Sequence, residues 1–419
     1  MRIRASTLHS LTAIALGIGA GSAHAAGFQL LEQNASGLGN AYAGSAAVAE
    51  NASTIFFNPA GMSYLPGLNV SAGVNVIIPS FKFRDNGNTR NPLGVGGMPP
   101  TGGSGGDAGS PAAVPNAYVS YQLNDRWHLG LGVGAPFGLM TKYDTGWAGQ
   151  FHSKKFEIKT YNINPSVSYR VNDMFALGAG VNWQRIEAEY TKQQVLPGFR
   201  STPVDVNMDG DAWGWNAGIM MQASPSTRIG LSYRSKIKHS ASGKTDITGV
   251  GKFDANANVD LPDTAVLSVF HNLTSRWDLL ADVSWSGWSS IPELNIHNKG
   301  VPGDTLKLQF RDTWRFAVGA NYKVNDAWKL KFGVAFDQSP VDDARYRPTS
   351  LPDNNRLWLS TGVQYQATKN TTIDVGYTYL HLRKTKIDND GESLITKGRI
   401  AGDYSSKGNI FGVQLSSRF

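Results

Sequence analysis

The chain has 419 residues, among them 47 glycines, 11 tryptophans and no cysteine, and its formal net charge is +7. The lack of cysteine excludes disulfides, thiolate metal sites, cysteine nucleophiles and a lipid attached through an N-terminal cysteine. The lysine and arginine residues are scattered along the chain, whereas nucleic-acid binding needs a concentrated basic face, so no nucleic-acid partner is expected.

The first 25 residues have the features of a secretory signal peptide. Arg2 and Arg4 supply positive charge, residues 8–20 are weakly apolar, and Ala-His-Ala at 23–25 is a small-residue cleavage motif. The alternative is a short membrane anchor, but the apolar run is too short and too rich in glycine and serine to span a bilayer. We therefore predict an exported protein whose mature chain begins at Ala26.

Residues 26–67 differ from the rest of the chain, because they are rich in glycine and alanine and show no period-two alternation. A periplasmic tail would be polar and rich in proline, whereas this segment carries apolar side chains that need packing partners: Phe28, Leu30, Leu38, Tyr42, Ile55, Phe56 and Phe57. We predict a hatch that plugs the lumen of the structure that follows. A plugged barrel has to select or gate, whereas an open one would be a diffusion pore.

From residue 68 to the C-terminus, large apolar side chains alternate with small or polar ones. Examples are residues 127–134, 328–336 and 373–379. This pattern is typical of strands in a sheet that meets a different environment on each face.

Six short polar turns alternate with seven long connections. The turns lie at 124–126, 172–173, 225–227, 274–276, 325–327 and 368–370, and the long connections at roughly 84–112, 138–155, 186–211, 235–260, 287–305, 337–355 and 381–408. Thirteen connections imply fourteen strands, an even number, as in bacterial outer-membrane barrels. We predict an all-β fold, a 14-stranded antiparallel transmembrane β-barrel over 68–419 with the hatch in its lumen.

A soluble all-β sandwich is the alternative, but it would leave many aromatic side chains on a water-exposed surface. In lipid, only a closed barrel satisfies the backbone of every strand. The last strand ends in Phe419, a feature that barrel-assembly machinery commonly recognises. Most tryptophans lie near predicted strand ends and are expected to be interfacial anchors.

The segment AGFQLLEQNASGLGNAYAGSAAVAENASTIFFNPAGM at 26–62 closely resembles the hatch of the FadL/TodX family of outer-membrane transporters for hydrophobic compounds. Further matching blocks lie at 135–143, 213–218, 303–306, 312–315, 333–341 and 351–353. The resemblance covers the whole mature chain and implies passive import of a hydrophobic small molecule, most simply a long-chain fatty acid, without a cofactor or metal.

The resemblance also implies a route. The hatch shifts, and ligand leaves sideways at a kink in the third strand, which would be Ala135, Pro136, Phe137 and Gly138. Proline cannot donate a ladder hydrogen bond and glycine tolerates unusual dihedral angles, so a break here has a local physical reason. The alternative is an ordinary strand end. The hatch motif Asn58, Pro59 and Ala60 would lie near the kink.

Fatty-acid importers of this family hold the ligand carboxylate with basic residues. The candidates here are Lys307, Arg311, Arg185 and Lys192, but Tyr190 occupies one position at which a basic residue is expected. Import of uncharged aromatic or aliphatic hydrocarbons therefore stays open. A porin or a surface adhesin is a further alternative.

No histidine forms a motif with a serine, so we expect no enzyme. The expected partners are a hydrophobic small molecule, outer-membrane lipid and lipopolysaccharide, and the barrel-assembly machinery during biogenesis. We expect a monomer in the outer membrane of a Gram-negative bacterium.

Overall fold

The computed structural model describes residues 27–198, 200–391 and 393–419. The predicted signal peptide lies outside these described residues. The described helices are short: η1 (Leu38–Asn40), α1 (Thr54–Phe57), η2 (Pro59–Tyr64), η3 (Leu93–Val95) and η4 (Trp288–Ser290). None of them is long and apolar enough to cross a membrane.

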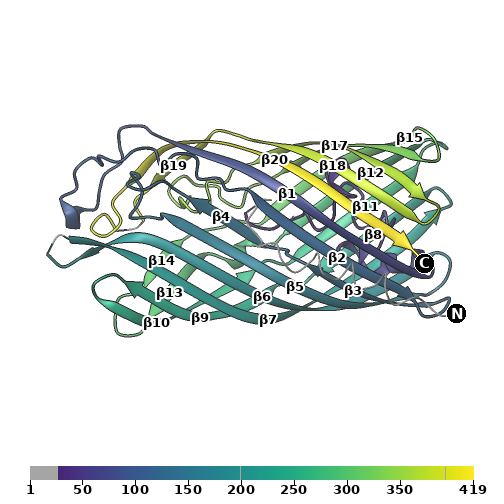
Figure 1. The fold of residues 1–419 in the computed structure, drawn as a ribbon, viewed down its shortest axis with the longest axis horizontal. Coiled ribbons are helices and arrows are strands. Elements are labelled where there is room, and N and C mark those ends of the chain that lie inside the picture. Colours follow the sequence, from purple (N-terminus) through teal and green to yellow (C-terminus); the bar gives the residue numbers. More distant parts are fainter. Residues whose placement is uncertain (1–26, 199, 392) are drawn as a thin grey trace.

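Fourteen antiparallel strands close into a barrel, as predicted. Each pairs with its neighbour in a ring that β1 and β20 close from Asn69–Arg418 to Asp85–Gly402 (Figure 1). In ring order the strands are β1 (Leu68–Asp85), β2 (Ala112–Gln122), β3 (Trp127–Gly134), β5 (Lys155–Arg170), β6 (Phe175–Leu196), β7 (Arg200–Ser224), β8 (Thr227–Arg234), β11 (Thr264–Asn272), β12 (Trp277–Ser286), β15 (Thr313–Lys323), β16 (Trp328–Asp337), β17 (Arg356–Thr368), β18 (Thr371–Leu382) and β20 (Ile400–Arg418).

All six predicted short turns join neighbouring strands at one end of the barrel, the end at which the C-terminus also lies (Figure 1). We call this the periplasmic end, and the opposite end the extracellular mouth. Six further strands extend the sheet beyond the ring at the mouth: β4 (Gly138–Lys142), β9 (Ile237–Ile247), β10 (Gly251–Leu261), β13 (Glu293–Asn298), β14 (Asp304–Lys307) and β19 (Thr385–Asn389).

The prediction of long loops at 186–211 and 235–260 is wrong. β6 and β7 pair without interruption up to Leu196–Arg200, and β9 and β10 form a hairpin up to Ile247–Gly251. Above the membrane the outward side chains become polar, which hides the contrast between the two faces. The buried residues Val204, Val206 and Met208 alternate with exposed polar residues and carried the missed signal.

In the periplasmic half of the barrel, the outer face is apolar and the inner face is largely polar. On β3, Leu129 and Leu131 are 47% and 46% exposed, whereas the inward His128 is 1% exposed. On β16 the outward Phe332 is 44% exposed, while the inward Lys331 is buried. A sheet that shows apolar side chains outward all round matches a lipid-facing barrel.

Aromatic pairs ring the periplasmic end. Tryptophans directly after three of the short turns contact tyrosines on the neighbouring strand, with ring centroids 4.5–4.7 Å apart: Trp127–Tyr169, Trp277–Tyr322 and Trp328–Tyr365. Such girdles mark a membrane interface. Three other tryptophans, Trp147, Trp288 and Trp358, are completely buried and belong to the interior.

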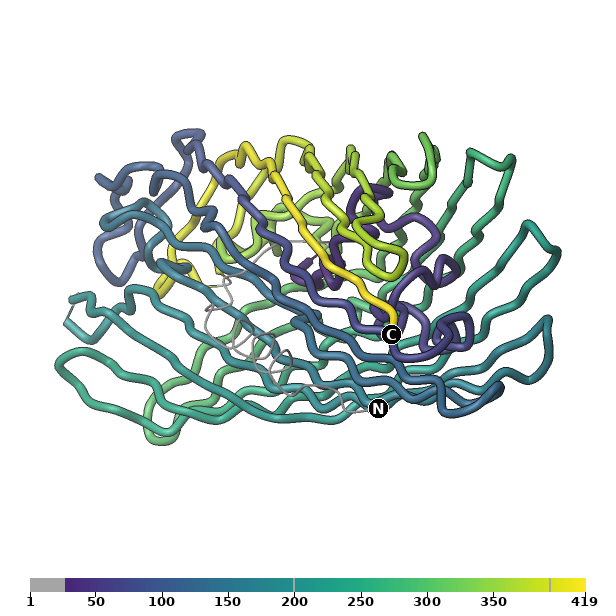
Figure 2. Tube along the Cα trace, turned by 45° about the vertical axis from the view of Figure 1, so that its right-hand side comes forward, coloured from purple at the N-terminus to yellow at the C-terminus, as the bar shows by residue number. Residues whose placement is uncertain are grey.

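Residues 27–67, here called the hatch, lie inside the periplasmic half of the barrel (Figures 1 and 2). Glycines of the wall let the hatch backbone approach closely. A Cβ atom at Gly230 would overlap the carbonyl of Ala46, and one at Gly333 would overlap the backbone of Asn40. The inward face of the barrel is thus shaped to accept this segment.

Candidate functional site

Cationic side chains of the wall hold the middle of the hatch. Each donates a hydrogen bond to a backbone carbonyl of the hatch: Arg170 to Ser63, Arg228 to Val48, Arg234 to Phe56, Arg315 to Ala41 and Lys331 to Ser36. These contacts come from strands on several sides of the barrel. They fix residues 36–63 of the hatch to the wall.

Lys331 is also the centre of a buried ion network. Its Nζ atom lies 2.7 Å from Glu50 Oε1 of the hatch and 2.9 Å from Asp374 Oδ1 of β18. The side chains of Lys331 and Asp374 are each 2% exposed. One buried ammonium group thus joins the hatch to two strands of the wall.

The third strand of the ring is broken where the sequence predicted a kink. β3 ends at Gly134, β4 begins at Gly138, and both pair with β5. The Thr160 hydroxyl of β5 accepts from the Phe137 amide at 2.9 Å. A proline at the centre of this break is consistent with its missing amide donor.

The other edge of this break is incompletely paired. The pairing of β2 with β3 ends at Ala117–Val133, and beyond it a single bridge joins Gly109 to Thr141. Among the described residues, no run of strand pairing links the outer part of β2 to β4. Both amide atoms of the buried Asn116 side chain on β2 lack a hydrogen-bond partner in the described structure. The barrel wall therefore has a local gap in its hydrogen-bond ladder.

The first residues of the hatch cover this break. Leu30 donates its amide to the Pro136 carbonyl at 2.8 Å, and Gly138 donates to the Phe28 carbonyl at 2.9 Å. The Gln33 side chain donates to the Ala135 carbonyl at 2.8 Å. Residues 28–30 thus act as a short added strand at the break.

An apolar cluster extends from the break toward the mouth. The Phe28 ring lies 4.9 Å from Trp288 and 6.1 Å from Phe137. The cluster continues along the inward faces of the mouth strands through buried residues that include Ile158, Ile186, Val206, Val259, Ile296, Leu308 and Phe310. It forms a continuous apolar interior above the hatch.

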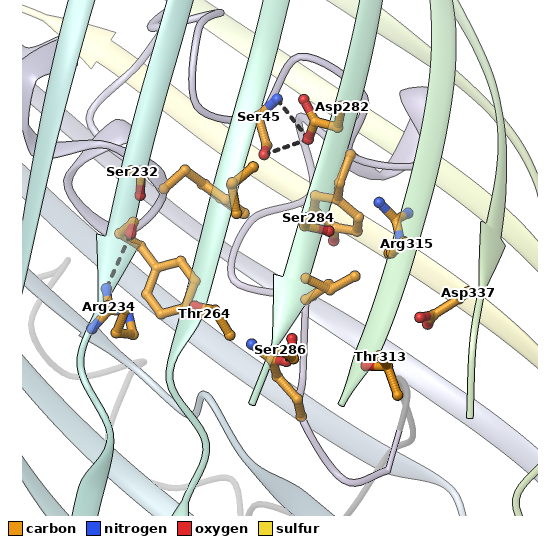
Figure 3. A pocket seen from close by; sticks show the side chains of 16 residues that line it. Ser45, Ser232, Arg234, Thr264, Asp282, Ser284, Ser286, Thr313, Arg315 and Asp337 are labelled. Atoms are coloured by element: carbon orange, nitrogen blue, oxygen red, sulfur yellow. Dashed lines mark hydrogen bonds between the residues drawn. The ribbon is translucent and has the colours of Figure 1, made fainter. Parts of the chain in front are cut away.

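A cavity lies on the other side of residues 29–31, between the hatch and strands β8, β11, β12, β15 and β16 (Figure 3). It is partly open to solvent. Ser45 of the hatch binds Asp282 at 2.7 Å, and Arg315 and Asp337 line the neighbouring strands (Figure 3). Phe56 and Phe57 add apolar surface, so the cavity has a mixed lining.

The Asn58-Pro59-Ala60 motif does not contact the break, which corrects the sequence-based placement. The Asn58 side chain donates to the Ala46 carbonyl at 2.8 Å and to the Ile219 carbonyl of β7 at 3.1 Å. The backbone of Pro59 and Ala60 packs on Gly178 of β6. The motif seats the hatch on β6 and β7, whereas Phe28, Leu30 and Gln33 meet the break.

Two of the four predicted carboxylate contacts point away from the interior. Arg185 lies on the outer face of β6, with its Nη2 atom 2.7 Å from Asp209. Arg311 is half-exposed and lies 2.9 Å from Asp342. Arg185 stands one position before the inward Ile186, so the strand alternation turns it outward. Arg311 lies in the connection between β14 and β15.

The other two candidates lie at the mouth. A pocket there is lined by Lys307, Arg345, Lys397, Tyr190 and His152, together with Thr305, Leu306, Tyr346, Pro348, Thr349, Ser350, Asn389 and Gly391. Lys192 lies beside it, with its Nζ atom 2.5 Å from Asp304. The sequence pointed to Lys192 and Lys307 but missed Lys397, which lies in another loop, far from both along the chain, and lacks a recognisable local motif.

Asp304 joins these groups electrostatically. Burial raises the pKa of Asp304, but the ammonium groups of Lys192 and Lys397 outweigh this and lower it to about 2. Burial lowers the pKa of His152 to about 3, with help from Lys397 and Lys192. At neutral pH the mouth therefore holds a charged Asp304 and an uncharged imidazole.

Within the described residues, no group of three or more histidine, aspartate or glutamate side chains could hold a metal ion. A closed barrel with a lipid-facing surface, a plugged lumen and a break in its wall defines an outer-membrane transport protein.

The family model for "Outer membrane protein transport protein (OMPP1/FadL/TodX)" matches residues 16–419, and the chain belongs to this family. It is a transport-family protein and not an enzyme. Outer membrane protein P1 of Haemophilus influenzae is 32% identical, over 98% of this chain and 99% of that protein. The long-chain fatty acid transport protein of Escherichia coli K12 is 29% identical, over 93% of this chain and 95% of that protein.

Solved structures of outer-membrane transporters have a similar fold. A FadL homologue of Pseudomonas aeruginosa superposes with a TM-score of 0.87 at 26% identity, covering 94% of this chain and all of that one. The toluene transporter TodX of Pseudomonas putida has a TM-score of 0.69 at 17% identity, covering 94% of this chain and 100% of that one. At this identity the likeness shows the shared fold alone.

Proposed function

We propose that this protein imports long-chain fatty acids across the outer membrane by passive, hatch-gated diffusion, with lateral exit at the break between β3 and β4. The observation that carries the proposal is the apolar cluster, which begins beside the cationic pocket at the mouth and ends at Phe28 and Phe137. This arrangement suits a molecule with an anionic head and a long apolar tail.

Gating requires only the first residues of the hatch to move. Residues 28–30 and Gln33 are held at the break by backbone and amide hydrogen bonds, whereas residues 36–63 are fixed by charged side chains of the wall. Displacing residues 28–31 joins the apolar interior and the adjoining cavity to the gap between β2 and β4. The rest of the hatch stays in place and keeps the lumen closed to water.

Lateral exit suits the ligand. Each CH₂ group of an acyl chain gains about 0.8 kcal/mol on burial, so release into the aqueous periplasm would be slow. Sliding through the wall into the bilayer avoids exposing the chain to water. Outer-membrane lipid is thus the acceptor of the ligand.

An uncharged hydrocarbon is the second candidate ligand. It is favoured by one observation, namely that Lys192 already pairs with Asp304 and is not left to bind a ligand carboxylate on its own. The relative that transports toluene supports the same alternative by its fold alone.

The proposal is tested by measuring the uptake of labelled oleate and of toluene by cells that express this protein and otherwise lack such a transporter. Oleate uptake above that of cells with an empty vector is the expected result. Toluene uptake without oleate uptake would move the substrate to uncharged hydrocarbons, and uptake of neither would overturn the proposal.

The lateral route is tested separately by Gly138→Arg. A Cβ atom at Gly138 already lies 3.0 Å from Leu30 Cδ1, so the arginine would fill the space between hatch and break. We expect a folded barrel that no longer takes up oleate. Gly103→Arg is the matched control, because a Cβ atom at Gly103 meets nothing within 4 Å. Normal uptake by Gly138→Arg would exclude this exit.

The remaining partners follow from the surface. Outward charges above the apolar belt, such as Arg185 with Asp209 and Asp211, suit contact with lipopolysaccharide head groups. The C-terminal strand ending in Phe419 suits recognition by barrel-assembly machinery. We propose a monomer.

A further inference from the structure

Asp304 is the first residue of β14 at the extracellular mouth and binds cations from two other segments. Its Oδ2 atom lies 2.5 Å from Lys192 Nζ of β6, and its Oδ1 atom lies 2.8 Å from Lys397 Nζ of the loop before β20. The Tyr190 hydroxyl donates to the His152 carbonyl at 2.5 Å and lies 3.4 Å from Oδ2. The side chains of Lys192, Asp304 and Lys397 are 10%, 13% and 11% exposed, so this is a largely desolvated group of charges.

The adjoining pocket lacks any acid of its own. Its described lining residues include Lys307, Arg345 and Lys397 but no aspartate or glutamate. The His152 Nε2 atom beside it is buried without a hydrogen-bond partner. Two of these cations are already paired, Lys397 with Asp304 at 2.8 Å and Arg345 with Asp343 at 2.6 Å, so a ligand head group would share them with these carboxylates.

The same pocket adjoins the apolar cluster. Tyr190 belongs to the apolar cluster and Leu306 packs against it, and both also line the pocket. A ligand whose head lies at Lys397 can therefore place its tail among the buried apolar side chains. Asp304 already holds the ammonium group of Lys397 at 2.8 Å.

We propose that Asp304 is a built-in competitor for the ligand head group, which sets how strongly the mouth pocket prefers a carboxylate over an uncharged head. This inference rests on the proposed function, since it assumes that hydrophobic ligands enter through the mouth. A ligand carboxylate gains Lys192 and Lys397 only by displacing the Asp304 carboxylate or by tolerating its repulsion. An uncharged head group neither has to displace the Asp304 carboxylate nor is repelled by it.

The decisive variant is Asp304→Asn, which keeps the shape of the side chain and an oxygen that accepts from Lys192. Binding of oleate and of oleyl alcohol to the full-length protein reconstituted in lipid bilayers is measured for wild type and variant. We expect the preference for oleate over oleyl alcohol to rise about tenfold, because a like charge next to the ligand head is removed. An unchanged ratio, even if both affinities fall, would mean that Asp304 only fastens the loops.

Two further variants keep the result clear. Lys397→Gln should shift the preference in the opposite direction, toward oleyl alcohol. Asp254→Asn removes an acid from an ion pair of the same length, 2.5 Å to Lys244, but this pair is exposed on the outer face of β10, so the ratio should stay at the wild-type value. A shift in Asp254→Asn equal to that in Asp304→Asn would overturn the inference.

The two proposals fail in different ways. If the wild-type protein binds neither ligand and supports no uptake, the proposed function falls and this inference falls with it. If the wild type binds and imports oleate while Asp304→Asn leaves the ratio unchanged, only the inference falls.

Discussion

Leu30 of the hatch and Pro136 of the barrel wall are joined by a backbone hydrogen bond of 2.8 Å. Together with the bond from Gly138 to Phe28, it makes Gln29 and Phe137 directly opposed residues of an antiparallel bridge. The plug therefore completes the wall where the wall is broken. On the proposed lateral route, this bridge has to open.

This bridge can be locked chemically. Gln29 and Phe137 form a non-hydrogen-bonded pair, in which the Cα atoms lie about 4.5 Å apart, within reach of a disulfide. The double variant Gln29→Cys/Phe137→Cys should lose oleate uptake when oxidised and regain it after reduction. Because the chain has no cysteine, no other disulfide competes.

Each single cysteine variant serves as the control for loss of the native side chain. Both should respond equally little to oxidant and reductant. Full uptake by the oxidised double variant, with the disulfide verified by mass spectrometry, would show that the hatch need not leave the break.

Lys331→Met should release the hatch from the wall. It leaves the Glu50 and Asp374 carboxylates buried without their ammonium partner, a loss of about 3–5 kcal/mol. Hydrogen exchange measured by mass spectrometry should rise in residues 36–63 while the barrel strands stay protected. Lys329→Met is the control, since Lys329 is more exposed and lies 3.4 Å from Glu50. Equal exchange in both variants would contradict the role given to Lys331.

The hatch should be more stable at low pH because of Glu32, which lies in the hatch outside the membrane-spanning strands. Burial raises the pKa of Glu32 from 4.5 to about 7, although Arg356 and Arg315 lower it and Asp337 raises it. Both carboxyl oxygens are buried without a hydrogen-bond partner in the described structure. The stability that the neutral Glu32 carboxyl gives the folded hatch is fully present below pH 4.5. It is lost as the pH rises to 7, where the carboxyl ionises, a change of about 3 kcal/mol.

Glu32→Gln should remove this dependence. Protection of residues 27–36 against hydrogen exchange, compared between wild type and variant at the same pH, should differ at pH 8 and agree at pH 4. A constant difference at both pH values would assign the effect to packing and not to the charge.

Much of the barrel could be predicted from local patterns, and the exceptions have physical causes. Alternation and turn residues act within a few positions, so the strand count and all six short turns were predictable. The extensions at 186–211 and 235–260 were missed because their outward side chains meet water and not lipid. In this region the buried Val204, Val206 and Met208 still alternate with outward residues, but the outward residues are polar.

The candidate site was less predictable, because it depends on contacts between distant segments. Pro136 and Gly138 mark the break by their own backbone properties. The partners of the break, Phe28 and Leu30, are more than a hundred residues away and carry no local signal. Likewise, only the fold could show that Arg185 and Arg311 face outward and that Lys397 joins Lys192 at Asp304.

A substitution at Asn58 tests where the hatch is fixed to the wall. Its side chain is the donor to the Ala46 and Ile219 carbonyls and the acceptor from the Ala60 amide, so Asn58→Leu leaves these buried groups unpaired at about 1–3 kcal/mol each. Because the motif seats the hatch on β6 and β7 and not at the break, the expected result is a leaky plug: faster influx of a small hydrophilic dye, with oleate uptake retained. Asn51→Leu is the control, since the bond from its amide to Ser36 Oγ at 3.0 Å stays within the hatch. Lost oleate uptake without a leak would instead place the motif in the gate.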